Sequence, residues 1–530
     1  MMQKVYWFTT LVVLPALIYV GLNLWHPIIY IAGLFAVLAV IGLYDLFFSP
    51  HTLNRLYPVA AYMRYGLEFI RPEIHQYFVA GDKEEFPFNR EQRNLVYRRA
   101  KGLDDTKPFG VQADINAAGY LGAAHSIVPA TVREEVKRVT VGGEHCSQPY
   151  NSSRLNISAM SFGSLSANAI LALNKGAKRG NFSHNTGEGG LSSHHRNGGG
   201  DIVWQIGTGY FGCRASDGGF DPEKFSEKAR LEQVKMIEIK ISQGAKPSHG
   251  GVLPAAKVSK EIAEVRGVEA GKEVDSPPAH RTFDTPLGLL AFVSQLRGLS
   301  GGKPVGFKLC IGHPYEFMAI CKAMLESGDT PDFITIDGAE GGTGAAPVEY
   351  SNRFGVPCLE AVYLVHNCLV GCGLRNRIKL IASGKTASAF DMVSKLAAGA
   401  DMVNAARTMM MALGCIQSQS CNTNRCPTGV ATQDPQRSKA LDVEAKHIRV
   451  ANFQATTLKT FFDMVGAMGL DDPGLLEPHH FWRRVGDGSK RSFDEIYPSL
   501  EQDELLREDI QHVYAKEWAK ASARSFHSQA

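Results

Sequence analysis

Two long apolar runs open the chain. Residues 5–44 contain no Asp, Glu, Lys or Arg, and His26 and Pro27 divide the stretch into runs 5–25 and 28–48, the second with Asp45 near its end. Each run has about 20 residues, enough for a helix to cross a bilayer core of roughly 30 Å. A signal peptide has a shorter apolar core, and a buried hairpin usually carries a polar stripe. The pattern therefore predicts a transmembrane helical hairpin over residues 1–48.

Basic residues predict how this hairpin is oriented. Lys4 precedes the first run, and Arg55, Arg64 and Arg71 follow the second. Both flanks of a hairpin lie on the same side of the membrane, and the positive-inside tendency makes that side cytoplasmic. We expect a chain anchored in the inner, cytoplasmic membrane by two N-terminal helices, with its larger part in the cytoplasm.

Residues 49–150 are mixed in pattern and are predicted to form a linking region. Within it, residues 90–101 hold four Arg and one Lys, which favours a helix with a solvated basic face. A surface facing anionic lipid headgroups is the alternative.

From about residue 155 short β-type runs alternate with helical stretches, which is typical of βα units. Several runs end in Gly, Ser, Asp or Lys, as the strands of a (β/α)8 barrel do at the face that carries function. The predicted fold class is α/β, a (β/α)8 TIM barrel over residues 151–470 followed by a helical C-terminal extension over 471–530, with an amphipathic tail at 501–521. The expected strands are 155–158, 181–184, 236–242, 273–276, 305–311, 333–337, 378–383 and 402–405.

Composition excludes two classes of protein. The 530 residues include 56 basic and 53 acidic side chains, and this balance does not favour a nucleic-acid partner. Ten scattered cysteines in so long a chain do not resemble an extracellular disulfide framework.

The last two predicted strands end in small residues. Ser383-Gly384-Lys385 follows one, and Asn404-Ala405-Ala406-Arg407 follows the other and leads into a helix. Small residues let backbone N–H groups reach a phosphate, and barrels often bind phosphate at this place, although small residues at strand ends also serve packing. Lys308 lies within an apolar strand. It either points into the barrel mouth, where it would place positive charge beside a flavin, or snorkels at the strand end.

Three cysteines follow the presumed phosphate loop: Cys415, Cys421 and Cys426, the last before a proline. Zinc usually takes four ligands and often uses C-x2-C pairs, and neither condition is met. A closing Cys-Pro is typical of iron–sulfur runs, and three thiolates fit a three-iron cluster better than a four-iron one. Packed thiols are the alternative. Glycine-rich loops at 185–190, 244–247 and 341–344 either form a polar mouth or are only turns.

Together these segments resemble the FMN-binding synthase domain of glutamate synthase, over about residues 150–470. The matching stretches are 157–166 (ISAMSFGSLS), 185–190 (NTGEGG), 238–247 (EIKISQGAKP), 276–278 (SPP), 341–345 (GGTGA) and 426–435 (CPTGVATQDP), with the cysteine run. The resemblance implies a barrel with FMN at its mouth and a [3Fe-4S] cluster beside it. It also implies an oxidoreductase acting on CH–NH2 donors, which aminates 2-oxoglutarate to glutamate through 2-iminoglutarate with hydride from reduced FMN.

The resemblance also implies roles for particular residues. For the isoalloxazine ring these are Ala159, Met160, Ser161, Gln205 and Lys308. For the ribityl chain and phosphate they are Asp337, Gly341, Gly342, Ser383, Gly384, Ala406 and Arg407. Lys246 and Arg266 match residues that bind the keto acid, Glu188 matches the acid at the ammonia entry, and Cys415, Cys421 and Cys426 match the cluster ligands.

The chain departs from this family in ways that affect substrate and partners. Val252 stands in place of a substrate-site glutamine, and His249 replaces an acid. The glutaminase domain, the glycine-repeat β-helix and a Rossmann fingerprint are not found in the sequence. The expected partners are 2-oxoglutarate or a related keto acid, ammonia from solution or from a separate glutaminase, and ferredoxin or a separate reductase subunit as electron donor. Two alternatives remain: an FMN oxidoreductase of the same barrel acting on another keto or amino acid, and a membrane-tethered electron-transfer subunit.

Overall fold

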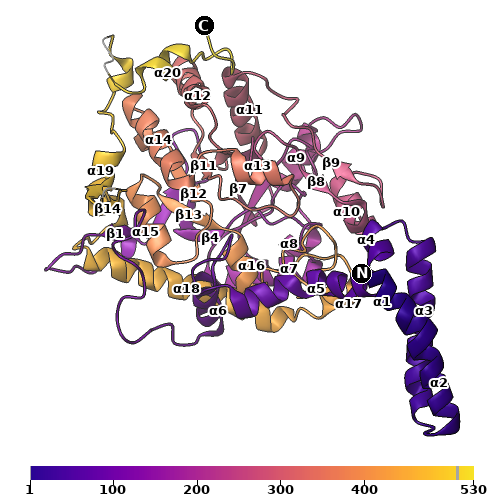
Figure 1. The fold of residues 1–530 in the computed structure, drawn as a ribbon. Helices are drawn as coiled ribbons and strands as arrows, with labels where there is room; N and C mark the ends of the chain where they lie inside the picture. Colours follow the sequence, from indigo (N-terminus) through magenta and orange to yellow (C-terminus); the bar gives the residue numbers. More distant parts are fainter. Residues whose placement is uncertain (1, 487, 509–511, 530) are drawn as a thin grey trace. The chain divides into compact units, whose positions relative to one another are not determined.

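The computed structural model describes residues 2–486, 488–508 and 512–529. The chain divides into two compact units, Met1–Arg90 and Glu91–Ala530 (Figure 1).

The first unit is helical. Its elements are α1 (Met2–Phe8), the π-helical stretch η1 (Thr9–Val13), α2 (Leu14–Asn23), α3 (Ile28–Phe47), α4 (Thr52–Leu56), α5 (Ala60–Ile74) and π-helical η2 (His75–Val79). The continuous stretch Met2–Asn23 and helix α3 are each long and apolar enough to span a membrane. A turn at His26 and Pro27 joins α2 to α3, as predicted, and Gly21 lets the backbone at Ile29 approach α2 closely.

The acid at the end of the second apolar run has a structural explanation. Asp45 is fully buried. Its carboxylate accepts hydrogen bonds from Asn54 Nδ2 at 3.2 Å, the Val59 backbone N–H at 2.9 Å and the Tyr62 hydroxyl at 2.9 Å. A buried carboxylate is tolerated when donors satisfy its oxygens. Asp45 therefore fixes the end of α3 to the segment that contains α4 and α5.

The second unit is built on a closed barrel of eight parallel strands, which confirms the predicted fold class. In order around the barrel these are β4 (Leu155–Ile157), β5 (His184–Asn185), β6 (Ile202–Ile206), β7 (Val234–Lys240), β10 (Val305–Leu309), β11 (Phe333–Asp337), β12 (Lys379–Ser383) and β13 (Met402–Ala405). The hairpin β2 (Arg138–Val141) and β3 (Tyr150–Ser153) packs Val139, Val141 and Tyr150 against early residues of the strands. This apolar cluster closes the amino end of the barrel.

Helices surround the strands, as Figure 1 shows. They are α7 (Ala167–Gly180), α8 (Ser193–Arg196), α9 (Pro222–Ala229), α10 (Lys260–Arg266), α11 (Pro286–Leu299), α12 (Pro314–Ser327), α13 (Val348–Arg353), α14 (Cys358–Gly371), α15 (Ala389–Ala397), α16 (Arg407–Leu413), α17 (Pro435–Lys439) and α18 (Val443–Ala467). Helix α7 shows how the sequence sets these bounds. The Ser166 side chain accepts from the Ala169 N–H at its start, and Asn181 ends it with a φ of 53°. Gly176 then allows α18 to pack closely, because a Cβ there would lie 2.7 Å from Val450.

The remaining elements are short. They are α6 (Arg90–Lys101), β1 (Leu121–Ala123), η3 (Glu134–Val136), β8 (Val252–Leu253), η4 (Ala255–Lys257), β9 (Val274–Asp275), η5 (Arg375–Arg377), η6 (Pro473–Leu475), η7 (Pro478–His480), β14 (Phe481–Arg484), β15 (Lys490–Ser492), α19 (Phe493–Ile496), η8 (Glu504–Leu506) and α20 (Ala515–Lys520). Strands β1, β14 and β15 form a small antiparallel sheet. The C-terminal region is helical in part, but the tail at 501–521 contains short helices where one amphipathic helix was expected, and residues 509–511 lie outside the described part.

One predicted barrel strand is wrong. Residues 273–276 contain β9, which pairs with β8 in a two-stranded antiparallel sheet outside the barrel. The barrel position belongs to β6, which pairs with β5 and β7. Residues 202–206 (Ile-Val-Trp-Gln-Ile) are the stronger β-type run, whereas residues 273–276 contain one apolar residue, Val274. The prediction overlooked the first run, which is the pattern typical of a buried barrel strand.

The basic helix also differs from its prediction. Residues Arg90–Lys101 do form helix α6, but Arg93 and Arg99 are each only 5% exposed, so its basic side chains do not form one solvated face. The Arg99 guanidinium pairs with Asp105 at 2.7 Å and donates to Thr457 Oγ1 of α18 at 3.3 Å. These contacts bind α6 to the body of the second unit.

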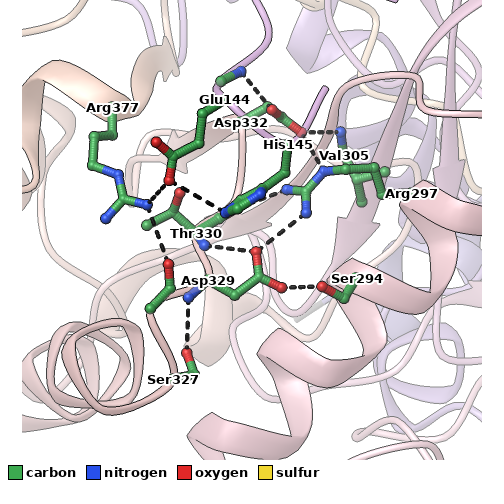
Figure 2. A network of polar contacts seen from close by, with 12 residues as sticks. Glu144, His145, Ser294, Arg297, Val305, Ser327, Asp329, Thr330, Asp332 and Arg377 are labelled. Carbon is green, nitrogen blue, oxygen red and sulfur yellow. Dashed lines mark hydrogen bonds and ion pairs between the residues drawn. The ribbon is translucent and has the colours of Figure 1, made fainter. Parts of the chain in front are cut away.

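A buried ionic network secures the amino ends of β10 and β11 (Figure 2). Arg297 of α11 pairs with Asp332 at 3.1 Å and with Asp329 at 3.2 Å, and donates to the Thr330 carbonyl at 2.6 Å. Asp332 is 2% exposed and also accepts from the Val305 N–H at 2.8 Å. One guanidinium therefore joins a helix to two strands.

We expect Arg297→Met to destabilise the protein by about 3–5 kcal/mol, because it leaves buried Asp332 without its cation. Denaturant unfolding in a fixed detergent measures the change. Arg524→Met is the matched control: Arg524 and Glu326 pair at 2.8 Å with side chains 79% and 42% exposed, and such a pair contributes about 0–1 kcal/mol. Equal effects of the two substitutions would contradict a stabilising role for this network.

Candidate functional site

The residues selected from the sequence gather at the carboxyl end of the barrel. Parallel strands of a closed barrel all end at the same face, so the segments that follow them meet there. Ala159, Met160 and Ser161 follow β4, Glu188 follows β5, Gln205 lies in β6, Lys246 follows β7, Lys308 lies in β10, Asp337 ends β11, Gly341 and Gly342 follow it, Ser383 ends β12 beside Gly384, and Ala406 and Arg407 follow β13. Arg266 ends α10, which follows the β8 segment.

A carboxylate in the middle of the barrel joins several strands. Glu238 of β7 is 1% exposed. It accepts hydrogen bonds from Asn185 Nδ2 of β5 at 2.8 Å, Gln205 Nε2 of β6 at 2.6 Å and Thr335 Oγ1 of β11 at 2.6 Å. The side chain of Gln205, one of the residues matched to the flavin ring, is therefore positioned by its hydrogen bond to Glu238 inside the barrel. The sequence reasoning missed Glu238, although an acid inside an apolar strand is the same kind of signal as Lys308.

Lys308 does not snorkel. Its side chain is buried, and Nζ lies 3.4 Å from Asp337 Oδ2. The same carboxylate oxygen accepts the Gly244 N–H at 2.9 Å. The pair brings two of the proposed flavin contacts together and attaches the 244–247 loop to the end of β11.

Glycines and basic side chains lie close together after β11, β12 and β13, where the sequence predicted a phosphate site. A Cβ on Gly342 would lie 2.6 Å from Arg407 Nε, and Gly384 adopts a φ of +141° that L side chains rarely take. The Arg407 guanidinium donates to the Glu340 carbonyl. Burial lowers the pKa of Arg407 and of Lys385, while nearby carboxylates act in the opposite direction. Cations beside side-chain-free backbone suit a phosphate group, so these residues fit the phosphate end of FMN.

Glu188, Lys246 and Arg266 lie within electrostatic reach of one another, and Lys240 joins them. Lys240 ends β7, and its Nζ lies 2.9 Å from Glu188 Oε1. Burial would raise the pKa of Glu188, but the charge and hydrogen bond of Lys240, with the charges of Lys246 and Arg266, lower it. Sequence reasoning missed Lys240, which lies inside the matched segment 238–247 as a strand-end lysine two residues after Glu238.

Both cations matched to substrate binding are perturbed by their surroundings. Burial lowers the pKa of Lys246 to about 8 and that of Arg266 to about 10, while the charge of Glu188 opposes both shifts. Lys246 Nζ donates to the Ala345 carbonyl at 2.9 Å. The Arg266 guanidinium lies 5.0 Å from the Phe211 ring centroid, and its Nε has no hydrogen-bond partner among the described residues. A guanidinium with an unused donor in a cationic mouth is suited to bind an anion.

The departure at Val252 falls close to this group. Val252 begins β8, and a Cβ on the preceding Gly251 would lie 2.5 Å from Glu188 Oε1. The backbone at Gly251 therefore passes directly beside Glu188. The next side chain, that of Val252, is apolar and cannot donate a hydrogen bond.

The three cysteines lie in the loop between α16 and α17. Cys415 and Cys421 are partly exposed and Cys426 is buried. Burial raises the pKa of Cys415 to about 12, and the other two sulfurs add to the shift, so the three are electrostatically coupled. Burial would also raise the pKa of Cys426, but hydrogen bonds from the N–H groups of Ala431, Thr428 and Val430 lower it.

A sulfur that receives several backbone N–H groups is stabilised as a thiolate, as a cluster ligand requires. In the described part of the chain, no group of three His, Cys, Asp or Glu side chains is placed to hold a single metal ion. Three thiols in one loop, one of them favoured as a thiolate, are the donor chemistry that an iron–sulfur cluster needs, so the residues of the loop fit such a cluster.

The cysteine loop is tied to the segment that follows β4. Gln433 Nε2 donates to the carbonyls of Gly163 at 3.0 Å and Leu165 at 2.8 Å. Ser166 Oγ donates to the Gly429 carbonyl at 2.7 Å, and the Ser166 N–H donates to the Val430 carbonyl at 2.9 Å. The matched segments 157–166 and 426–435 are thus two sides of one interface, between the region expected to hold the flavin and the region expected to hold the cluster.

Comparisons with known proteins bear on the family of the chain. The family model described as the conserved region in glutamate synthase matches residues 112–471. The glutamate synthase large subunit-like protein YerD of Bacillus subtilis is 39% identical over 488 residues, covering 84% of this chain and 93% of that protein. The archaeal glutamate synthase [NADPH] of Methanocaldococcus jannaschii is 35% identical over 316 residues, which are 59% of each chain.

A solved mandelate oxidase with (S)-4-hydroxymandelic acid superposes with a TM-score of 0.43 at 11% identity, covering 75% of this chain and 98% of that one. That likeness is too distant to bear on function. The family match and the YerD alignment are sufficient by themselves: the chain belongs to the glutamate synthase family and is a glutamate synthase-type oxidoreductase acting on CH–NH2 donors.

Proposed function

We propose that this chain binds FMN and a [3Fe-4S] cluster and aminates 2-oxoglutarate reductively to L-glutamate through 2-iminoglutarate. The observation that carries the proposal is the charge of the barrel mouth. Lys240, Lys246 and Arg266 supply three positive charges against the one negative charge of Glu188, a net charge of +2 that complements a dicarboxylate. Exposed Asp275 also acts on Lys246, but solvent screens an exposed charge.

The residues of this chain have distinct tasks in the proposed reaction. Arg266 can bind a carboxylate through two parallel hydrogen bonds, and Lys246 acts as a point charge. Glu188, beside Lys240, would receive a proton from ammonium as ammonia attacks the keto carbon, and would return it to the carbinolamine hydroxyl, which leaves as water to give protonated 2-iminoglutarate. Bound FMN would supply hydride from N5 to C2 of the imine. Lys308, in the buried pair with Asp337, would place positive charge beside the flavin, and Gly342, Gly384 and Arg407 would hold its phosphate.

Val252 favours a second candidate, an FMN oxidoreductase that acts on another keto or amino acid. The loss of a hydrogen bond to a charged group costs roughly 1.5–3 kcal/mol. Two cations should outweigh that loss, so we retain 2-oxoglutarate as the substrate. Ammonia would come from solution or a separate glutaminase, and electrons from ferredoxin or a separate reductase.

The test of the proposed reaction is single-turnover reoxidation. Protein reduced anaerobically should be reoxidised by 2-oxoglutarate plus ammonium, with one glutamate formed per flavin. Arg266→Ala should weaken the binding of 2-oxoglutarate about 10- to 100-fold, because it removes a hydrogen bond to a charged group, which is worth about 1.5–3 kcal/mol.

Arg214→Ala is its matched control. That guanidinium also faces the Phe211 ring, at 5.8 Å, but donates to the Gly209 carbonyl. Faster reoxidation by a monocarboxylate keto acid than by 2-oxoglutarate would refute the glutamate synthase reaction and leave the second candidate.

Binding of 2-oxoglutarate should depend on pH through Lys246. The pKa of Lys246 is about 8, so its ammonium is charged below that pH and becomes neutral above it. Affinity should therefore fall as the pH rises from about 7 to 9. Isothermal titration calorimetry on the oxidised protein measures this affinity at each pH. Lys246→Arg, which keeps its charge throughout this range, should bind with little pH dependence. The same decline in both proteins would show that another group titrates.

We also propose that the two apolar helices anchor the protein in the cytoplasmic membrane. Each is long enough to span a bilayer core of roughly 30 Å. Deleting residues 1–48 should move the protein from the membrane pellet to the soluble fraction, while a carbonate wash should leave the full chain in the pellet. Recovery of the full chain in the soluble fraction without detergent would contradict the anchor.

A further inference from the structure

Lys257 is a buried cation with little to compensate it. It ends the short helix η4 and is 2% exposed. Its Nζ donates one hydrogen bond, to the Ser164 carbonyl at 2.9 Å. Among the residues that the structure describes, no carboxylate lies within 4.0 Å of Nζ. An ammonium group has three donors, and burying a charge without a counter-charge is costly.

Another buried lysine shows the contrast. Lys303 Nζ donates to two carbonyls, those of Ala229 and Leu231, each at 2.7 Å. Lys257 has one such acceptor among the described residues, so its positive charge is less compensated than that of Lys303 and could be balanced by a bound anionic group.

The cysteine loop is what faces Lys257. Asn424, between Cys421 and Cys426, donates from Nδ2 to the carbonyl of Ala256, the residue next to Lys257, at 3.1 Å. Asn424 Oδ1 in turn accepts the Gln433 N–H at 2.6 Å, which fixes the loop over η4. The charges of Cys421 and Cys426 act on Lys257. The short helix that ends in Lys257 therefore lies against the part of the loop between Cys421 and Cys426.

Lys257 also contacts the segment that follows β4. Ser164, its carbonyl partner, lies three residues after Ser161, one of the proposed flavin contacts. Lys257 thus lies between the segment that would hold the flavin and the loop that would hold the cluster.

We propose that Lys257 is the counter-charge of the iron–sulfur cluster and raises its reduction potential. The inference rests on the cluster assigned under the proposed function. A cluster held by three thiolates is anionic, and reduction adds one more negative charge. A cation buried beside it stabilises the reduced form more than the oxidised form, because the attraction is weakly screened in a medium of low dielectric constant. The effect favours electron acceptance by the cluster next to the flavin.

The experiment uses the full chain in detergent. Iron and sulfide analysis and the electron paramagnetic resonance signal of the oxidised protein first establish the cluster. A redox titration followed by the same signal then gives its midpoint potential. In Lys257→Met the ratio of reduced to oxidised cluster, at the wild-type midpoint, should fall at least tenfold, a shift of about 59 mV for one electron. Lys257→Arg should stay near the wild-type potential, and Lys303→Met is the control for loss of a buried lysine elsewhere.

Each outcome decides between the two proposals. Wild-type protein with no iron overturns both the cluster and the role of Lys257. A cluster whose potential is the same in wild type and Lys257→Met overturns the role of Lys257 alone. If Lys257→Met loses the cluster while Lys257→Arg keeps it at the wild-type potential, the positive charge is what matters and the inference is supported. Loss of iron from both variants, but not from Lys303→Met, would assign Lys257 a purely structural role and overturn it.

Discussion

The site depends on one buried carboxylate that has no ionic partner among the residues that the structure describes. Glu238 lies in the barrel centre and receives three hydrogen bonds, from side chains of β5, β6 and β11. Each of those donors would be left without a partner in a low-dielectric interior if the acid were lost, and burying an unsatisfied polar group is costly. The network therefore fixes the relative register of β5, β6, β7 and β11 just below the barrel mouth. The positions of the side chains nearer the mouth depend on that register.

The layer above follows from the alternation of side chains along a strand. Glu238 and Lys240 lie two residues apart on β7, so both point into the barrel, as do Thr335 and Asp337 on β11. In the lower pair, Thr335 donates a hydrogen bond to Glu238, whose other oxygen accepts from Asn185 and Gln205. The upper pair makes ion pairs, Lys240 with Glu188 and Asp337 with Lys308. The acid in the middle of the barrel is thus satisfied by neutral donors, whereas ion pairs form at the end where substrate and cofactor would enter.

The sequence predicted the barrel better than it predicted the site. Alternating β-type and helical runs identified the architecture, and Gly, Ser, Asp and Lys at strand ends identified the face expected to carry function, because those signals are local. One strand was assigned wrongly: β6 is a fully buried run of five residues, Ile-Val-Trp-Gln-Ile, whereas β9 contains one apolar residue, so the local pattern favoured β6 and the prediction overlooked it. Glu238, Lys240 and Lys257 were missed for a different reason: each is a single polar residue whose meaning depends on a partner from a distant segment. Arg93 and Arg99 show the opposite error, in which a basic run looked solvated although two of its arginines are buried.

The interface between the segment after β4 and the cysteine loop explains why the matched motifs are long. A flavin contact needs only a few residues after β4, and a cluster needs three thiols. Gly163, Leu165 and Ser166 are nevertheless bound by Gln433, Gly429 and Val430, and η4 is bound to the same loop through Asn424. These contacts use backbone carbonyls as acceptors on both sides, so they fix the separation of the two segments whatever side chains occupy the surrounding positions. Electron transfer between the proposed flavin and cluster would need such a fixed separation, and the contacts that fix it extend over both segments.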